Sequence, residues 1–172
     1  FSLKRSSMSR NLELKVKLKS PKTVIEKITE NDGEFVKTLH QKDVYYQYSG
    51  GLLKLRIENG DACLIKYNRD ETGERRWSDY EILYLEGEHP EDYLADILHP
   101  EAEVVKERHL YMYKKTRIHI DKVENLGSFL ELESVIKDDQ SEAEKEFYEL
   151  VDLLELDLNK QIKTSYRYLV NH

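Results

Sequence analysis

The stretch RIHIDKVENLGSFLELE, residues 117–133, decides how the rest of the chain is interpreted. It predicts two strands joined by a turn at residues 125–127, because ionisable and aliphatic residues alternate on both sides of this Asn-x-Gly segment. Successive side chains of a strand point to opposite faces, so the ionisable residues of each strand share one face. That face carries Arg117, His119, Asp121, Glu131 and Glu133. It either meets bulk water or lines an interior, and the remaining strands decide between the two.

The composition predicts one soluble domain. The chain has 172 residues, of which 39% are hydrophobic and 35% are charged, and no apolar run is long enough to cross a bilayer. We therefore expect a cytoplasmic protein with no membrane partner. A net charge of -7 argues against nucleic-acid binding, and the single cysteine excludes an internal disulfide. We expect residues 1–9 to be a tag or disordered leader and residues 10–172 to form one domain.

Alternation and turn signals predict about eight strands with helices at the start, middle and end. Short loops between most of the strands favour antiparallel neighbours, and Asn59-Gly60 is a hairpin signal. Helices are expected from Pro21, from Pro90, from a capping box at Ser141 and Glu144, and over residues 159–170. The expected strands are 12–19, 35–48, 52–58, 62–69, 77–86 and 104–113, followed by the hairpin.

The polar faces of these strands repeat one chemistry, in which cations stand beside carboxylates while the opposite faces are aliphatic. Residues 12–19 place Glu13 and Lys15 opposite leucines, and residues 52–58 place Lys54 and Arg56 on one face. A barrel covered outside by helices must turn its polar residues inward, and eight strands enclose room for one small ligand. The fold class expected is α+β, an eight-stranded antiparallel β-barrel, or tunnel, with helices packed on the outside.

A dry interior does not accept unpaired charges, because their burial costs several kcal/mol per ion. The interior should therefore hold a charged ligand. Lysine and arginine suit phosphate oxygens, whereas paired carboxylates hold hard cations such as Mg²⁺ or Mn²⁺. The residue types thus describe a site for a metal ion and a polyphosphate. No glycine-rich phosphate loop is present, so side chains would hold the phosphates.

The chain also resembles a known family. Residues 11–15 (NLELK) resemble the E-x-E-x-K signature of CYTH domains, the triphosphate tunnel metalloenzymes that include class IV adenylyl cyclases, thiamine triphosphatases and inorganic tripolyphosphatases. The form of the block at 118–133 is closest to the class IV adenylyl cyclase-like group. Further matches follow in the family's order at 41–46, 53–56, 64–67, 77–80, 105–108 and 163–166.

The resemblance implies roles for individual residues and a Mg²⁺ or Mn²⁺ cofactor. The first glutamate of the signature is Asn11 here, which offers an oxygen without a charge and would weaken one metal position. Asp121, Lys66 and Arg56 are the residues expected to act in catalysis. The metal would be held by Glu13, Glu131 and Glu133 with Asp121 in support. The triphosphate would be held by Lys15, Lys54, Arg56, Lys66, Arg108 and Arg117, with Lys106 a weaker match.

Three functions remain open. The first is metal-dependent hydrolysis of inorganic tripolyphosphate or an organic triphosphate, which we favour. The others are conversion of ATP to cyclic AMP and pyrophosphate, and noncatalytic binding of polyphosphate, since a fold and a phosphate cradle do not settle the chemistry. The partner expected is a triphosphate-bearing small molecule whose organic group no motif identifies. His119 has a structural alternative to catalysis, Tyr45, Tyr80 and Tyr166 either contact substrate or pack, and the apolar exterior is compatible with a homodimer.

Overall fold

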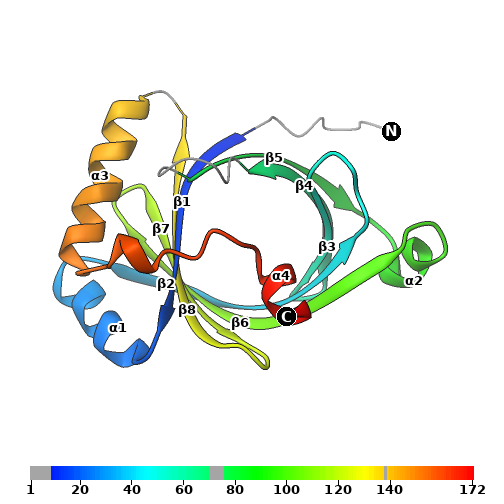
Figure 1. The fold of residues 1–172 in the computed structure, drawn as a ribbon, viewed down its shortest axis with the longest axis horizontal. Helices are drawn as coiled ribbons and strands as arrows, with labels where there is room; N and C mark the ends of the chain where they lie inside the picture. Colours follow the sequence, from blue (N-terminus) through cyan, green and yellow to red (C-terminus); the bar gives the residue numbers. More distant parts are fainter. Residues whose placement is uncertain (1–8, 70–75, 138) are drawn as a thin grey trace.

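A computed structural model describes residues 9–69, 76–137 and 139–172, and this part of the chain forms a closed barrel with helices around it (Figure 1). The strands follow the order β1-β5-β4-β3-β2-β6-β7-β8 around the barrel. Their bounds are β1 Ser9–Leu18, β2 Glu34–Tyr46, β3 Leu52–Glu58, β4 Asp61–Arg69, β5 Arg76–Leu85, β6 Pro100–Tyr113, β7 Thr116–Val123 and β8 Gly127–Ile136.

Every neighbouring pair of strands is antiparallel, as the short loops predict. The strand β1 closes the barrel, because it pairs with β8 along one edge and with β5 along the other. Asn59 and Gly60 join β3 to β4 with φ values of 49° and 92°, the positive pair that a two-residue hairpin turn requires. The eight-stranded antiparallel barrel expected from the sequence is thus confirmed.

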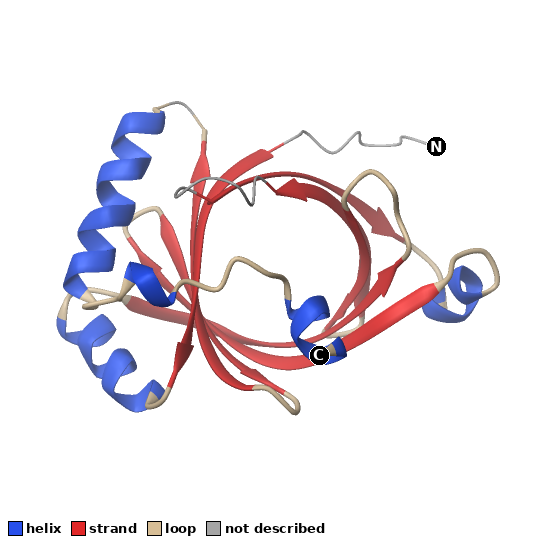
Figure 2. Cartoon of the chain, in the orientation of Figure 1, coloured by secondary structure: helices blue, strands red, loops and turns tan. Residues whose placement is uncertain are grey.

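Two helices cover one side of the barrel, and Figure 2 shows both against the same group of strands. These are α1 (Pro21–Glu30) and α3 (Gln140–Leu153). The outward leucines of β1 pack with Ile28 of α1 and with Phe147 and Leu150 of α3 in one buried cluster. Burial of each such side chain contributes ~1.5–3 kcal/mol. This packing fixes which face of β1 is outside, so Glu13 and Lys15 must point inward.

A smaller helix, α2 (Pro90–Ala95), lies between β5 and β6 at the far end of the molecule in Figure 1. Leu94 and Leu98 pack against Val44 and Leu55 on the outer face of β2 and β3. The prediction of helices on the outside is therefore confirmed for α1, α2 and α3. None of the helices in the described part of the chain is long and apolar enough to span a membrane.

The C-terminal region departs from the predicted helix over residues 159–170. It forms a short 3-10 helix, η1 (Leu158–Lys160), and then an extended segment and α4 (Tyr166–Asn171). The backbone N–H of Ile162 donates to the carbonyl of Lys15 at 2.8 Å, which ties the extended segment to β1. Figure 1 shows this segment crossing one mouth of the barrel. The helix is broken because the segment is held against the barrel.

Two further expectations differ in detail. The helix α3 is capped by Asp139, whose carboxylate accepts from the backbone N–H of Glu142, so the predicted capping box at Ser141 and Glu144 is wrong by two residues. The predicted leader lies outside the described residues except for Ser9, which begins β1. The described parts of residues 10–172 otherwise make the single barrel.

Candidate functional site

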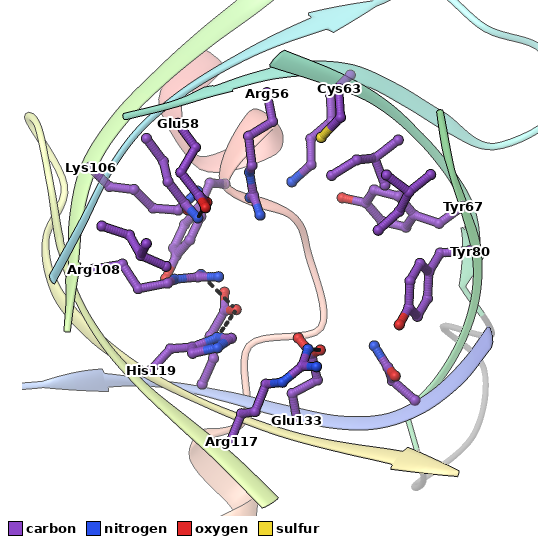
Figure 3. A pocket seen from close by; sticks show the side chains of 18 of the residues that line it. Arg56, Glu58, Cys63, Tyr67, Tyr80, Lys106, Arg108, Arg117, His119 and Glu133 are labelled. Carbon is purple, nitrogen blue, oxygen red and sulfur yellow. Dashed lines mark hydrogen bonds and ion pairs between the residues drawn. The ribbon is translucent and has the colours of Figure 1, made fainter. Parts of the chain in front are cut away.

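The barrel encloses a cavity of about 620 Å³, within the range of ~300–1,000 Å³ that small-molecule sites occupy. Figure 3 shows basic side chains on one side of it and tyrosines on the opposite side. Its charged lining residues in the described part of the chain come from seven of the strands, which is the charge-lined interior predicted from alternation. They are Glu13, Lys15, Lys37, Lys54, Arg56, Glu58, Asp61, Lys106, Arg108, Arg117, Glu131 and Glu133.

A single buried carboxylate organises three of these cations. Asp43 of β2 is fully buried and accepts from Lys54 Nζ at 3.0 Å and from Lys106 Nζ at 2.9 Å. Arg56 donates to both of its oxygens, from Nε and Nη2, at 2.8 Å each. We call these four residues the basic pole. One negative charge faces three positive ones, so the cluster has an excess of positive charge at the cavity wall.

Burial and crowding shift the protonation of this pole. Burial by itself would raise the pKa of Asp43, yet Arg56, Lys106 and Lys54 hold that pKa well below its usual range. Burial, helped by neighbouring arginines, lowers the pKa of Lys106 to about 7 and that of Lys54 to about 8. An anion in the cavity would favour the charged lysines. The charge and chemistry of the basic pole therefore suit a negatively charged ligand.

A second buried carboxylate, Asp121 of β7, holds Arg108. The guanidinium donates to both oxygens of Asp121 at 2.7 Å and to Glu131 Oε2 at 3.1 Å. Tyr166 of α4 donates its hydroxyl to Asp121 Oδ2 at 2.8 Å. Burial would raise the pKa of Asp121, but Arg108 keeps it below the ordinary value. Arg108 is thus fixed between a buried carboxylate and the cavity.

Three glutamates lie side by side on β1 and β8, and we call Glu13, Glu131 and Glu133 the acidic pole. Glu13 and Glu133 are directly opposite each other across the two strands. Glu131 lies 3.4 Å from Lys15 Nζ and 3.1 Å from Arg108, and these cations hold its pKa well below the usual range although burial opposes them.

The donor chemistry of the acidic pole fits Mg²⁺ or Mn²⁺ that enters with a phosphate. Among the described residues, no three His, Cys, Asp or Glu side chains are already gathered around one metal position. Mg²⁺ is commonly held by one or two carboxylates while substrate phosphates and water complete its six ligands. Glu13 and Glu133 supply such a pair, and Glu131 stands two residues from Glu133 on the same face.

Two buried polar atoms beside this pole have no hydrogen-bond partner in the described part of the chain. Asn11 Oδ1, on the cavity face of β1 two residues before Glu13, is one of them. A buried oxygen without a partner is costly, so it is suited to a metal ion or its bound water. The other atom is His119 Nδ1, which lies 3.9 Å from Glu131 Oε2, beyond hydrogen-bonding distance. Both residues line the cavity, although these two atoms themselves are buried.

The structure brings most of the predicted site residues to the cavity. On the phosphate side the lining includes Lys15, Lys54, Arg56, Lys106, Arg108 and Arg117, and on the metal side it includes Glu13, Glu131 and Glu133. Arg117 donates to Glu133 at 2.9 Å, and its side chain is 44% exposed, so it stands near an opening of the cavity. The positions agree with the sequence analysis, while the binding roles remain predictions.

Two of the predicted site residues, Lys66 and Asp121, are not among the described residues that line the cavity. Lys66 lies between Ile65 and Tyr67, both of which line the cavity, so its side chain points outward and pairs with Glu81 at 2.6 Å. Asp121 shares the inward face of β7, yet it is fully buried behind Arg108 and has no place in the cavity lining. Its carboxylate positions Arg108, and its role toward a metal or substrate stays a prediction.

The sequence analysis missed Asp43 and the role of Tyr166. A signal for Asp43 existed, because Gln41, Asp43 and Tyr45 alternate along β2 next to the basic strand β3. Tyr166 could not be placed, because the break in the predicted C-terminal helix depends on its contact with the barrel. Lys15 Nζ lies 3.9 Å from the centre of the Tyr166 ring, a distance typical of a cation–π contact.

The described strands thus form a closed barrel whose cavity has a basic and an acidic pole. Residues 9–166 match the CYTH domain family. The chain therefore belongs to that family, as its resemblance implied. No match was found among curated proteins.

Solved structures share the fold. PH1819 protein from Pyrococcus horikoshii has a TM-score of 0.73 and 27% identity, over 94% of this chain and 98% of that one. A conserved hypothetical protein from Pyrococcus furiosus has a TM-score of 0.76 and 21% identity, over 92% and 99% of the two chains. A candidate adenylate cyclase from Vibrio parahaemolyticus has a TM-score of 0.75 and 16% identity, over 94% and 98%.

Proposed function

We propose that this protein is a divalent-metal-dependent hydrolase of triphosphates, which bind in the barrel between its basic and acidic poles. The observation that carries the proposal is the basic pole, where one buried carboxylate holds three cations at a cavity wall. Such an excess of fixed positive charge favours a polyanion. The acidic pole would repel that polyanion unless a cation accompanied it, so the two poles together favour a metal-bound triphosphate.

The chain's own residues would act mainly by binding and orientation. Arg56, Lys54 and Lys106 would hold phosphate oxygens, and Asp43 fixes their positions without reaching the ligand. Arg108 and Lys15 contact Glu131, so they place positive charge beside the acidic pole. A bound Mg²⁺ or Mn²⁺, held by Glu13 and Glu133, would neutralise charge that develops on the phosphoryl group. Water would be the acceptor, giving orthophosphate and a diphosphate.

Cyclisation of ATP is a second candidate. The same cradle would hold the triphosphate, and a cavity of about 620 Å³ leaves room for a nucleoside. The ribose 3′-hydroxyl would then replace water and attack the α-phosphorus, which releases pyrophosphate.

Product identification on a substrate panel tests the proposal. Tripolyphosphate, ATP and thiamine triphosphate would each be incubated with Mg²⁺, with Mn²⁺ or with EDTA, and the products separated by ion-exchange chromatography. We expect orthophosphate from at least one substrate with metal and none with EDTA. Cyclic AMP with pyrophosphate would instead identify a cyclase.

A thermal-stability measurement separates an enzyme from a binding module. A ligand present at a hundred times its dissociation constant stabilises a protein by ~2.7 kcal/mol. Stabilisation by tripolyphosphate without any product would mean a noncatalytic polyphosphate-binding module. Absence of both turnover and stabilisation would overturn the proposal.

A further inference from the structure

The lining of the cavity is asymmetric. Charged side chains come from the strands on either side, but β4 and β5 present a different chemistry (Figure 3). Among the described side chains of these two strands that line the cavity, the one charged group is Asp61, the first residue of β4. The remaining lining residues of β4 and β5 are Ala62, Cys63, Ile65, Tyr67, Ser78, Tyr80, Ile82, Tyr84 and Leu85.

Three cross-strand pairs build this surface, which we call the apolar wall. The pairs are Cys63 with Tyr84, Ile65 with Ile82, and Tyr67 with Tyr80. They alternate with outward residues, so the three pairs stack over a length of ~13 Å at 3.3 Å per residue. An apolar surface of this extent inside a hydrated, charged cavity is unfavourable unless a ligand covers it.

The apolar wall is not simply part of the packed core. Ile65 and Tyr67 are buried and belong to a cluster with Tyr45 and Tyr166, but Tyr80 and Ile82 are only partly buried. Their apolar atoms therefore keep exposure toward the cavity. This exposure distinguishes a binding surface from ordinary packing.

The apolar wall borders the basic pole directly. Arg56 of β3 is the cross-strand partner of Cys63, and Lys54 is the partner of Ile65. A ligand whose phosphates contact Arg56 and Lys54 would thus present its next group to β4 and β5. Inorganic tripolyphosphate is charged along its whole length and would leave the apolar wall exposed to water.

We propose that the apolar wall, around Tyr67, Tyr80 and Ile82, binds the organic group of the substrate, so that the ligand is an organic triphosphate carrying a planar ring. Stacking on a tyrosine face and removal of aliphatic surface from water would both favour such a ring. A nucleobase and the rings of thiamine share this chemistry. This inference rests on the proposed function, since it places the ring beside bound phosphates.

The variant Tyr80→Ala tests the inference through dissociation constants. Nonhydrolysable analogues of tripolyphosphate, ATP and thiamine triphosphate would be titrated calorimetrically into the full chain with Mg²⁺ present, so that binding is measured without turnover. Loss of a stacking partner should weaken the affinity for an organic triphosphate by roughly 5- to 150-fold. Affinity for tripolyphosphate should change by less than about twofold, because its charges do not contact the ring.

Two control variants make the result specific. Tyr80→Phe keeps the ring and should keep the affinity, whereas Tyr93→Ala removes a tyrosine that is 70% exposed on α2 and should change nothing. Retained affinity for tripolyphosphate shows that Tyr80→Ala still folds. Weaker binding of ATP alone, or of thiamine triphosphate alone, would support the inference and identify the ring.

Equal effects on all three ligands, or no effect on any, would overturn the inference while leaving the proposed function intact. If the unmodified protein bound no triphosphate at all, the proposed function would fail first, and this inference would fail with it. The two failures are therefore distinguishable in one set of titrations.

Discussion

The basic and acidic poles use buried charge in different ways. In the basic pole one carboxylate, Asp43, serves three cations, and burial lowers the pKa of two lysines to about 7 and about 8. In the acidic pole each glutamate of β8 is matched by a cation, since Glu131 contacts Lys15 and Arg108 while Glu133 contacts Arg117. The first pole has unbalanced positive charge and the second is almost balanced.

This difference supports the proposal that the barrel binds a polyanion together with a metal. The unbalanced pole gains most from an anion, because its cations repel one another until an anion arrives. In the balanced pole, ligand binding would exchange contacts. The cations that now pair with the glutamates would contact phosphate oxygens, and the glutamates would contact the metal. Predictions that unbalance or rebalance the poles therefore test the account.

The largest effect is expected for stability when Asp43 is changed to Asn. The change leaves three cations around a neutral, buried amide, and removal of one partner from a buried ion pair costs ~3–5 kcal/mol. Asp121→Asn disturbs one arginine and should cost less. Urea denaturation at neutral pH gives the free energy of unfolding of each variant. A larger loss of stability for Asp121→Asn would contradict the expectation that Asp43, which contacts three cations, contributes more to stability than Asp121.

The next effect concerns activity, and it compares the inner and outer faces of adjacent strands. Arg56→Gln removes a donor from the basic pole and should lower kcat/KM for a triphosphate by roughly 10²–10³-fold, as for other groups that stabilise developing charge. Lys66→Gln removes a cation from the outer face and should have less than about a twofold effect. Similar losses in both variants would mean that position in the barrel does not decide the role.

A smaller effect is expected from pH. Lys106 has a pKa of about 7 in the free protein, so it is mainly neutral at pH 8, and a bound polyanion would raise that pKa. Binding at pH 8 should then take up a proton. As the pH rises, the affinity should fall by at most about tenfold per pH unit for each proton taken up. Calorimetry of tripolyphosphate binding in buffers of different ionisation enthalpy measures the uptake.

Lys106→Met should reduce this proton uptake, because the titrating group is gone. Any proton that tripolyphosphate itself releases on binding is released in the variant as well, so the difference between the two proteins isolates the lysine. Equal uptake in both would show that Lys106 is charged before the ligand arrives.

The sequence predicted the barrel and the inward charges because alternation is a strong local signal. The leucines of β1 opposite Glu13 and Lys15 required one face to be covered, and α1 and α3 cover it. The sequence did not settle which individual side chains reach the cavity, because that depends on the pairing between strands. Lys66 has the same residue type as Lys54, and its direction is set by register alone.

Asp121 illustrates a second limit. Its residue type and its face were predicted correctly, but a carboxylate in that position either reaches the ligand or stands behind an arginine. The bidentate contact with Arg108 and the hydroxyl of Tyr166 decide for the second arrangement. The Tyr166 contact comes from the C-terminal segment that crosses the mouth of the barrel, and no local pattern specifies where that segment lies.

In the proposed complex, a metal-bound triphosphate bridges the two poles. The most direct test of this proposal is a crystal structure with Mn²⁺ and a nonhydrolysable ATP analogue, in which anomalous scattering locates the metal. We expect Mn²⁺ between Glu13 and Glu133, with phosphate oxygens on Arg56 and Lys54. Phosphates bound outside the barrel, or Mn²⁺ bound away from these glutamates, would contradict the account.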